Sequence, residues 1–208
     1  NYHSEPQYYL LGSKLRDSRT TYIEMMTDHL KINQGVFIDI FPLDGQWRTE
    51  REHQMFRKKR AIFEAARRVR LNYNRLSPQN IGMVRTNWLL FRLFGYKHDT
   101  AAETAAFDNY ISSFSTDDSN IWCNHANSTS PLEYAPKGQY GNGVWMKFEG
   151  ISVRVPAQYD AYLTQKYGDW RGGIPPDEQY GHHHYVRCDL HRPFTEYIDT
   201  GEKEVKKS

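Results

Sequence analysis

Residues 35–45 read Gly-Val-Phe-Ile-Asp-Ile-Phe-Pro-Leu-Asp-Gly, and they place an acidic side chain inside a run that is otherwise typical of a β-strand. The β-branched and aromatic residues around Asp39 predict a strand covered on both faces, and Pro42 with Gly45 predicts the turn that ends it. An unpaired buried carboxylate costs several kcal/mol, so Asp39 must be ion-paired, hydrogen-bonded or bound to a metal. A structural carboxylate and a metal-binding or catalytic one are both open from this pattern.

The rest of the chain predicts a mixture of strands and helices. Extended segments are expected at residues 8–15 and 22–26. A long helix is expected at 49–76, with Thr49 as an N-cap before Glu52. Further helices are expected at 82–94, at 100–114 with Asp99 or Thr100 as the cap, and at 156–167. A strand is expected at 120–124 and a hairpin at 144–155. The C-terminal part after 167 is expected to be irregular. These elements predict a mixed α/β (α+β) fold.

Composition narrows the class of protein. The 208-residue chain has a net charge of +2 and a mean hydropathy of −0.81, which favours one polar globular domain at residues 1–200 with a charged tail at 201–208. The near-balanced charge argues against nucleic acid as a partner. Cys123 and Cys188 are too few for a disulfide framework and indicate free thiols in a reducing cytosol. No apolar run has the length of a transmembrane segment, so a cytoplasmic protein is expected.

Several blocks of the sequence resemble one known family. Residues 14–24 (Lys-Leu-Arg-Asp-Ser-Arg-Thr-Thr-Tyr-Ile-Glu) and 32–44 (Ile-Asn-Gln-Gly-Val-Phe-Ile-Asp-Ile-Phe-Pro-Leu-Asp) resemble consecutive signature blocks of the LicD family. Four later segments resemble the family's C-terminal block: residues 148–156, 159–163 and 167–169, and the triplet His182-His183-His184. LicD proteins are phosphocholine transferases of the nucleotidyltransferase superfamily, to which the fukutin-like proteins also belong. The resemblance covers residues 8–185 and implies a partial nucleotidyltransferase-like fold with a mixed sheet and several helices.

The resemblance implies a transferase that moves phosphocholine from CDP-choline, or a CDP-choline-like donor, to a hydroxyl of a cell-surface glycan or teichoic acid precursor. The acceptor is then a glycan or a lipid-linked glycan, as in lipopolysaccharide modification, and the expected location is the inner face of the membrane. Divalent cations, Mg²⁺ or Mn²⁺, neutralise the phosphate oxygens during such an in-line displacement. By this resemblance Asp39 is the catalytic, metal-binding carboxylate, and Asp44 supports it from the turn or from a second layer of contacts.

One feature of the family is missing from this sequence. LicD-like proteins resemble other nucleotidyltransferases in having a Gly-rich turn and a strand-borne cluster of Asp residues near the N-terminus, and no such element precedes Arg16. The chain is therefore expected to be a fragment or a truncated copy that lacks part of the metal site, since a lone carboxylate holds Mg²⁺ poorly. A catalytically inactive glycan- or choline-binding module stays open as an alternative, as does a nucleotidyltransferase-fold enzyme that uses another diphosphate donor.

Three further residues are candidates for substrate contacts. Arg16 can bind a phosphate through two N–H groups at once, or it can pair with Asp39. In an extended chain alternate residues share a face, so His182 and His184 are expected to act together while His183 points away from them. Their imidazoles can hydrogen-bond a phosphate or ligate zinc, and a structural role for the triplet is also open.

The helix expected at 49–76 has a distinctive charge pattern. Its apolar residues at a spacing of seven are Met55, Ile62, Val69 and Leu76, with Phe56 and Phe63 beside them. Its cations are Arg57, Lys58, Lys59, Arg60, Arg67, Arg68, Arg70 and Arg75, against a single Glu64 in the same span. Such a basic face fits an anionic lipid or polymer as partner, and a solvated helix face paired to acids elsewhere is the alternative.

Overall fold

The structure, a computed structural model, describes residues 3–5, 8, 10–70, 81–94, 99–126, 131–179 and 183–198. It holds 40% helix and 21% strand, which confirms the mixed α/β class predicted from the sequence. Within the described residues the strands form four small sheets in which every pairing is antiparallel, rather than the mixed sheet that was expected. The predicted tail at 201–208 lies outside the described residues. Among the helices that are described, none is both long and apolar enough to cross a bilayer.

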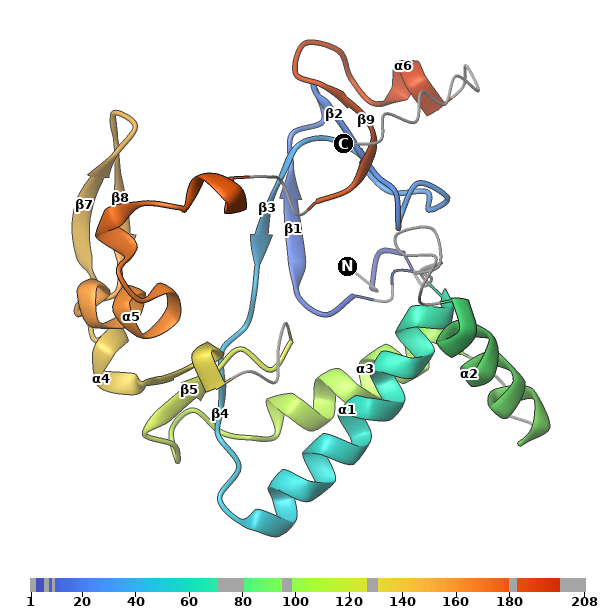
Figure 1. The fold of residues 1–208 in the computed structure, drawn as a ribbon, viewed down its shortest axis with the longest axis horizontal. Coiled ribbons are helices and arrows are strands. Elements are labelled where there is room, and N and C mark those ends of the chain that lie inside the picture. Colours follow the sequence, from blue (N-terminus) through green and yellow to red (C-terminus); the bar gives the residue numbers. More distant parts are fainter. Residues whose placement is uncertain are drawn as a thin grey trace. The chain divides into compact units, whose positions relative to one another are not determined.

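The chain divides into two compact units, unit 1 with residues 1–41, 55–108 and 181–208, and unit 2 with residues 42–54 and 109–180. In unit 1, β1 (Ser13–Arg16) pairs with β3 (Phe37–Ile40), and β2 (Thr21–Glu24) pairs with β9 (Tyr185–Asp189). In unit 2, β4 (Asp44–Gly45), β5 (Ile121–Cys123) and β6 (Tyr134–Pro136) form one sheet, and β7 (Val144–Phe148) pairs with β8 (Ile151–Val155). The helices are α1 (Glu50–Arg70), α2 (Ile81–Leu93), α3 (Thr100–Ser112), α4 (Lys137–Tyr140), α5 (Tyr159–Tyr167) and α6 (Thr195–Ile198) (Figure 1).

Helix α1 begins with a capping box. The Oγ1 of Thr49 accepts a hydrogen bond from the backbone N–H of Glu52 at 3.2 Å, and the Oε2 of Glu52 accepts one from the N–H of Thr49 at 3.1 Å. This reciprocal pair satisfies N–H groups that lack helical partners at a helix N-terminus, and it confirms the predicted cap. Asp99 caps α3, because its Oδ1 accepts a hydrogen bond from the N–H of Ala102 at 3.0 Å.

The apolar face of α1 differs from the predicted one. Phe56 and Phe63 are buried, whereas Met55 and Ile62 are 45% and 55% exposed. The rings of Phe63 and Phe107 stack with 4.6 Å between their centroids, so α1 packs on α3 through its phenylalanines. Met55 and Ile62 lie seven residues apart, and so do Phe56 and Phe63. The pair with the larger, aromatic side chains is the one that is buried.

Strands β7 and β8 form the predicted hairpin around a two-residue turn. Glu149 and Gly150 have φ angles of 47° and 81°, the positive values that such a turn requires. The register sets Phe148 opposite Ile151, so these two side chains point to the same face of the hairpin. Here a local turn signal was sufficient to predict the pairing.

Strand β3 lies where the sequence predicted it, but it is not a central strand. In the described structure it pairs only with β1, with Asp39 opposite Lys14. Ile38 and Ile40 are 67% and 52% exposed, so the prediction of a strand covered on both faces was wrong. Phe37 and Asp39 point to the opposite, partly covered face, because successive side chains of a strand alternate.

The C-terminal segment forms regular elements that the sequence analysis missed. Residues 185–189 form β9, which pairs with β2 and buries Val186, and α6 follows. The prediction of an irregular segment was wrong because the partner strand lies far away in the sequence, where no local pattern points to it. The register shifts between Ile23 and Glu24, and this β-bulge bends the pair of strands where Glu24 lies.

The loop between β2 and β3 folds tightly against β1. A Cβ atom at Gly35 would lie 1.9 Å from the carbonyl oxygen of Asp17, so only glycine fits this position. The N–H of Asp17 donates to the carbonyl of Val36 at 2.8 Å. The side chain of Gln34 donates to the Thr27 carbonyl at 2.7 Å and closes the loop. These contacts hold the first three strands in the arrangement that forms the site.

Candidate functional site

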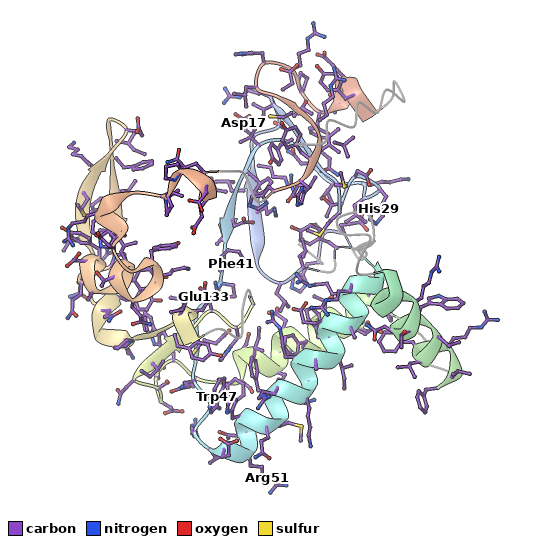
Figure 2. The ribbon with its side chains drawn as sticks, in the orientation of Figure 1. Asp17, His29, Phe41, Trp47, Arg51 and Glu133 are labelled. Atoms are coloured by element: carbon purple, nitrogen blue, oxygen red, sulfur yellow. The ribbon has the colours of Figure 1, made fainter. Side chains whose placement is uncertain are left out.

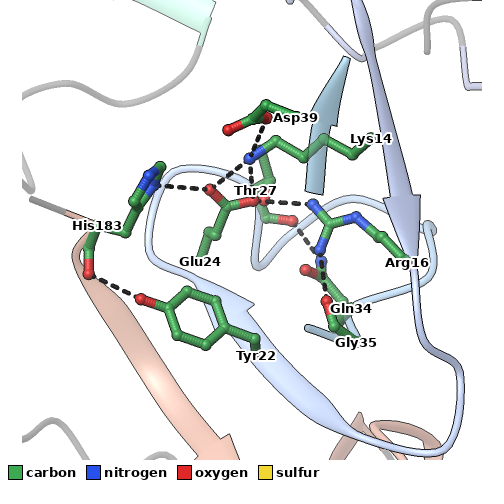
Figure 3. A network of polar contacts seen from close by, with 9 residues as sticks. All are labelled: Lys14, Arg16, Tyr22, Glu24, Thr27, Gln34, Gly35, Asp39 and His183. Atoms are coloured by element: carbon green, nitrogen blue, oxygen red, sulfur yellow. Dashed lines mark hydrogen bonds and ion pairs between the residues drawn. The ribbon is translucent and has the colours of Figure 1, made fainter. Parts of the chain in front are cut away.

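Unit 1 contains a group of ionisable residues that we call the charged cluster: Lys14, Arg16, Glu24, Asp39 and His183 (Figure 3). Lys14 and Arg16 lie two residues apart on β1 and so share one face of the strand. The antiparallel register sets Asp39 opposite Lys14. Glu24 ends β2, and His183 lies just before β9, the partner of β2. The cluster therefore links the two sheets of unit 1.

Glu24 lies at the centre of the charged cluster, with its side chain only 7% exposed. Lys14 Nζ donates to Oε1 and Oε2 of Glu24 at 2.9 Å and 3.1 Å, and Arg16 Nη2 donates to Oε2 at 2.8 Å. His183 Nδ1 lies 3.7 Å from Oε1, a contact that becomes an ion pair only when the imidazole is protonated. Because a buried carboxylate without partners is strongly destabilising, these cations are what allows Glu24 to be buried.

Asp39 is ion-paired with Lys14 and not with Arg16. Its Oδ1 lies 3.4 Å from Lys14 Nζ, and its side chain is 28% exposed. The ammonium group of Lys14 donates hydrogen bonds to both oxygens of Glu24, and its contact with Asp39 is an ion pair. The same ammonium lies 3.3 Å from the centre of the Phe37 ring, where a cation–π contact adds to its binding. The pairing of Arg16 with Asp39, which the sequence left open, is therefore not formed.

Arg16 is held by a neutral and an acidic partner at once. Its Nη1 donates to the Gly35 carbonyl at 3.1 Å, its Nη2 donates to Glu24, and its side chain is 7% exposed. Tyr8 also contacts Arg16, and burial is the main reason that the pKa of the Tyr8 hydroxyl rises to about 12. The charges of Glu24 and Asp39 raise this pKa further, while Arg16 lowers it. The Tyr8 hydroxyl is thus protonated at neutral pH and can donate a hydrogen bond.

The histidine triplet reaches the charged cluster through a different residue from the predicted ones. His182 lies outside the described residues. His184 is exposed, and its carbonyl accepts a hydrogen bond from the N–H of Met25 at 3.0 Å. His183, which was expected to point away from His182 and His184, is the residue of the triplet whose Nδ1 lies beside Glu24. The pairing of β9 with β2 sets this orientation. The roles of His182 and His184 as substrate contacts stay predictions.

Asp44 belongs to unit 2. It lies in β4 opposite Cys123 of β5 and is buried. Burial and then the charge of Asp44 raise the pKa of the Cys123 thiol to about 12, so this thiol is protonated at neutral pH. The role of Asp44 as a support for Asp39 stays a prediction.

A pocket of about 370 Å³ opens beside the charged cluster. Its lining consists of Ser4, Glu5, Tyr8, Lys14, Arg16, Lys31, Ile32 and Asn33. Three of these side chains are cationic and one is acidic. Glu24 and Asp39 lie beside the pocket and pair with two of these cations, so the formal charges balance, and Lys31 is an exposed cation that can attract an anion. Lys31 is exposed, whereas Lys14 and Arg16 are engaged with carboxylates. The volume lies within the usual range for small-molecule sites.

The charged cluster does not fit a divalent metal ion as it stands. Glu24 and Asp39 are both in contact with the Lys14 ammonium group, which would repel an ion of the same sign. Within the part of the chain that the structure describes, no group of three or more His, Cys, Asp or Glu side chains is placed to hold a metal. The metal-binding role of Asp39 stays a prediction.

Unit 2 contains a group of a different kind, which we call the aromatic cluster: Trp47, His53, Phe114, His125 and Tyr134. The rings of Trp47 (labelled in Figure 2) and His53 stack at 4.1 Å, and Tyr134 meets Trp47 edge to face at 5.5 Å. His125 is fully buried, and its Nε2 lies 3.0 Å from the Gly45 carbonyl oxygen. Ring contacts at these distances are typical of a packed interior.

The sequence analysis found part of the charged cluster and missed part. It singled out Arg16 and Asp39 but not Lys14 or Glu24. A usable signal was present, because Lys14 and Arg16 lie two residues apart at the end of the extended segment predicted at 8–15 and would share a face if the strand continued. Nothing local indicates Glu24, since its partners become neighbours only when the strands assemble.

Comparisons of this chain with protein-family models, with curated proteins and with solved structures find no match. The resemblance to the LicD family therefore remains a hypothesis that rests on the sequence blocks themselves. The function has to be inferred from the charged cluster and its pocket.

Proposed function

We propose that this chain belongs to a LicD-like transferase and that the pocket beside the charged cluster binds the phosphates of a CDP-choline-like donor. One observation supports this most. The two blocks that resemble the family, residues 14–24 and 32–44, fold against each other, and both contribute to the pocket lining. Lys14 and Arg16 come from the first block, and Asn33 comes from the second. Family-like segments that meet at a cationic pocket are what a substrate site requires.

The side chains around the pocket suit a diphosphate. Phosphate oxygens are strong acceptors, and guanidinium and ammonium groups bind them through charge-assisted hydrogen bonds. Lys31 is exposed and can turn its ammonium group to the ligand. Arg16 has five N–H donors, of which the contacts with Gly35 and Glu24 use only some. Tyr8, whose raised pKa keeps its hydroxyl protonated, adds a neutral donor.

The proposed reaction is an in-line displacement at phosphorus. The acceptor hydroxyl oxygen forms a bond to the phosphorus of phosphocholine while the bond from that phosphorus to the bridging oxygen of CMP breaks. The hydroxyl proton passes to a base, and in this proposal the base is Asp39. Of the two carboxylates in the cluster, Asp39 is partly exposed and pairs with Lys14, whereas Glu24 is buried between Lys14 and Arg16. Asp39 is therefore the carboxylate that an acceptor can reach.

A binding module without catalysis is the second candidate, and the salt bridges favour it. Lys14 and Arg16 together balance the charges of Glu24 and Asp39, an arrangement that stabilises the fold but does not fit a divalent metal. In this case the pocket retains the phosphate of phosphocholine or of a glycan, and no bond is broken.

Calorimetric titration of the chain with CDP-choline, CDP, phosphocholine and inorganic phosphate tests the pocket. Lys31→Gln removes one cation from its lining, and Arg19→Gln is the matched control because Arg19 pairs with Asp17 and does not line the pocket. We expect CDP-choline to bind and Lys31→Gln to weaken binding about fivefold, the equivalent of ~1 kcal/mol for one charge-assisted contact. Equal effects of the two variants, or no binding of any of these ligands, would refute the pocket assignment.

Release of CMP from CDP-choline in the presence of Mg²⁺ and a glycan acceptor separates the candidates. Binding with release supports the transferase. Because the chain is expected to lack part of the metal site, binding without release supports the module only if release is also absent in a version extended by a Gly-rich turn and an Asp cluster. Turnover of a different nucleoside diphosphate donor, with CDP-choline inert, would assign the chain to another transfer reaction.

A further inference from the structure

Helix α2 presents an apolar stripe to solvent, which we call the α2 stripe: Leu89, Leu90, Leu93 and Phe94, with exposures of 50%, 44%, 70% and 83%. Phe94 extends the helix by one position, because its N–H donates to the Leu90 carbonyl at 3.0 Å. Spacings of three and four residues place these side chains on one side of the helix. Large apolar side chains that are exposed together mark a contact surface.

Cations accompany the α2 stripe. Arg85 and Arg92 are both exposed and lie seven residues apart, which is close to two helical turns, so they share one side of α2. The guanidinium carbon of Arg92 lies 5.3 Å from the centre of the Trp88 ring, and Trp88 is itself 51% exposed. The helix contains no acidic residue. All charged residues of the helix are therefore cationic.

The charge of the chain is segregated around α2. Between Glu64 and Asp99 the sequence holds seven Lys and Arg and no Asp or Glu. The remaining sequence has 20 Lys and Arg against 25 Asp and Glu, an excess of acid, although the whole chain carries +2. This excess of positive charge favours an anionic partner for the segment.

We propose that α2 lies in the interface of an anionic lipid bilayer, with the α2 stripe among the acyl chains and Arg85 and Arg92 at the headgroup phosphates. A helix with an apolar face, a cationic polar side and a Trp has the composition of an interfacial helix. An anionic bilayer satisfies both parts of the surface at once. A nucleic acid would bind the arginines but would leave the α2 stripe in water.

The geometry places the helix on the bilayer and not across it. Helix α2 has 13 residues and is therefore about 20 Å long. Crossing the hydrocarbon core takes about 20 apolar residues. The proposed insertion is shallow, and it is independent of the pocket in the charged cluster.

The hairpin of β7 and β8 supplies a matched control. At its tip Phe148 and Ile151 are 62% and 60% exposed, an apolar surface comparable to that of Leu93 and Phe94. Glu149 lies in the turn between them, and a carboxylate opposes approach to an anionic surface. The hairpin tip is therefore expected to stay out of the bilayer.

Co-sedimentation of the full chain with vesicles tests the proposal. Vesicles of phosphatidylcholine alone are compared with vesicles that also contain phosphatidylglycerol. We expect binding only to the anionic vesicles. Leu93→Ser with Phe94→Ser should weaken it by on the order of tenfold or more, because apolar burial is lost. Phe148→Ser with Ile151→Ser should leave it unchanged. Circular dichroism of each double variant establishes that it is folded.

The electrostatic part is tested separately. Arg85→Gln with Arg92→Gln should weaken binding to anionic vesicles about 25-fold, since each Arg near a charged membrane contributes about fivefold. Arg51→Gln with Lys147→Gln removes the same charge from exposed positions outside α2 and should have little effect. Equal binding to both kinds of vesicle, or equal loss in the two pairs of variants, would overturn the proposal.

A third measurement leaves the four side chains of the α2 stripe unchanged. Trp fluorescence of the bound chain should be quenched by brominated lipid, and the quenching should fall in Trp88→Phe but persist in Trp145→Phe, although Trp145 is 72% exposed. Quenching that follows Trp145 instead would assign the contact to the hairpin. A dimer that forms without lipid and is lost in Leu93→Ser with Phe94→Ser would assign the α2 stripe to self-association and overturn the proposal.

Discussion

The charged cluster of unit 1 and the aromatic cluster of unit 2 are two different ways to fill an interior. In the first, Glu24 is buried and is surrounded by Lys14, Arg16 and His183. In the second, His125 is fully buried and is surrounded by rings. Charges removed from water are destabilising unless they are paired, whereas rings gain free energy from burial itself. For the same volume the charged cluster therefore contributes less to stability.

This difference indicates where function should be sought. Apolar residues in place of a buried ion pair are often as stable or more stable, so stability alone does not explain the charged cluster. Ionisable groups that lie beside a pocket are candidates for function. The contacts of the aromatic cluster, in contrast, are explained by packing. Changes in the two clusters should therefore have different consequences, and the following predictions test this.

The largest effect is expected at Glu24. Glu24→Gln keeps the shape of the side chain but leaves Lys14 and Arg16 with an uncompensated buried charge, so the free energy of unfolding should fall by about 3 kcal/mol or more. Urea denaturation measures this. Glu133→Gln is the control in unit 2, because among the described residues its cationic partner is Lys166 at 3.0 Å, and it should be less sensitive. A cost for Glu24→Gln no larger than for Glu133→Gln would mean that the cluster is not a cooperative unit.

The aromatic cluster should respond to a change of shape and not to salt. Trp47→Leu removes the stack on His53 and the edge contact with Tyr134, and it should lower the free energy of unfolding by about 2 kcal/mol, because Trp47 is only partly buried. The cost should be the same in low and high salt. If instead it falls as salt rises, the cluster depends on charge and the distinction between the two interiors fails.

The clusters also differ in how far the sequence predicts them. The cap at Thr49 and the hairpin turn at 149–150 follow from short patterns, because their partners are neighbours in sequence. The strand at 37–40 follows from its own β-branched and aromatic residues, although its position at the edge of a two-stranded sheet does not. The ion pairs of Glu24 join two strands that are not hydrogen-bonded to each other, β1 and β2, and its contact with His183 joins residues from opposite ends of the chain. Such contacts appear only after assembly, which is why the sequence predicted Asp39 and Arg16 individually but not their partners.

High pH should destabilise the charged cluster through Tyr8. The pKa of Tyr8 is about 12 in the folded chain against 10.0 ordinarily, so the unfolded chain loses this proton first. The folded state then binds more protons between these pH values, and stability falls as pH rises. The contribution of Tyr8 to the free energy of unfolding, which we call the Tyr8 share, is fully present below about pH 10 and should be smaller by about 1 kcal/mol at pH 11.

Urea denaturation at about pH 9 and 11 measures the Tyr8 share as a difference in the free energy of unfolding. Tyr8→Phe should reduce this difference, and Tyr167→Phe, which removes the hydroxyl of a tyrosine that is 63% exposed, should leave it as it is. An unchanged difference in Tyr8→Phe would show that Tyr8 titrates as it does in the unfolded chain.

The smallest change in stability is expected at Asp39, and it decides what kind of carboxylate Asp39 is. Asp39→Asn removes a partly exposed charge 3.4 Å from Lys14, which keeps its contacts with Glu24, so the free energy of unfolding should change by less than about 1 kcal/mol. If the proposed transferase function holds, the same variant should lower CMP release about 100-fold or more. Binding of CDP-choline should not weaken, because a negative charge has been removed beside an anion pocket. Asp17→Asn, whose partner Arg19 is exposed, should leave both turnover and binding unchanged. A loss of stability as large as that of Glu24→Gln, with turnover and binding intact, would make Asp39 a structural ion pair, and the charged cluster would then be an interior with no more chemical role than the aromatic one.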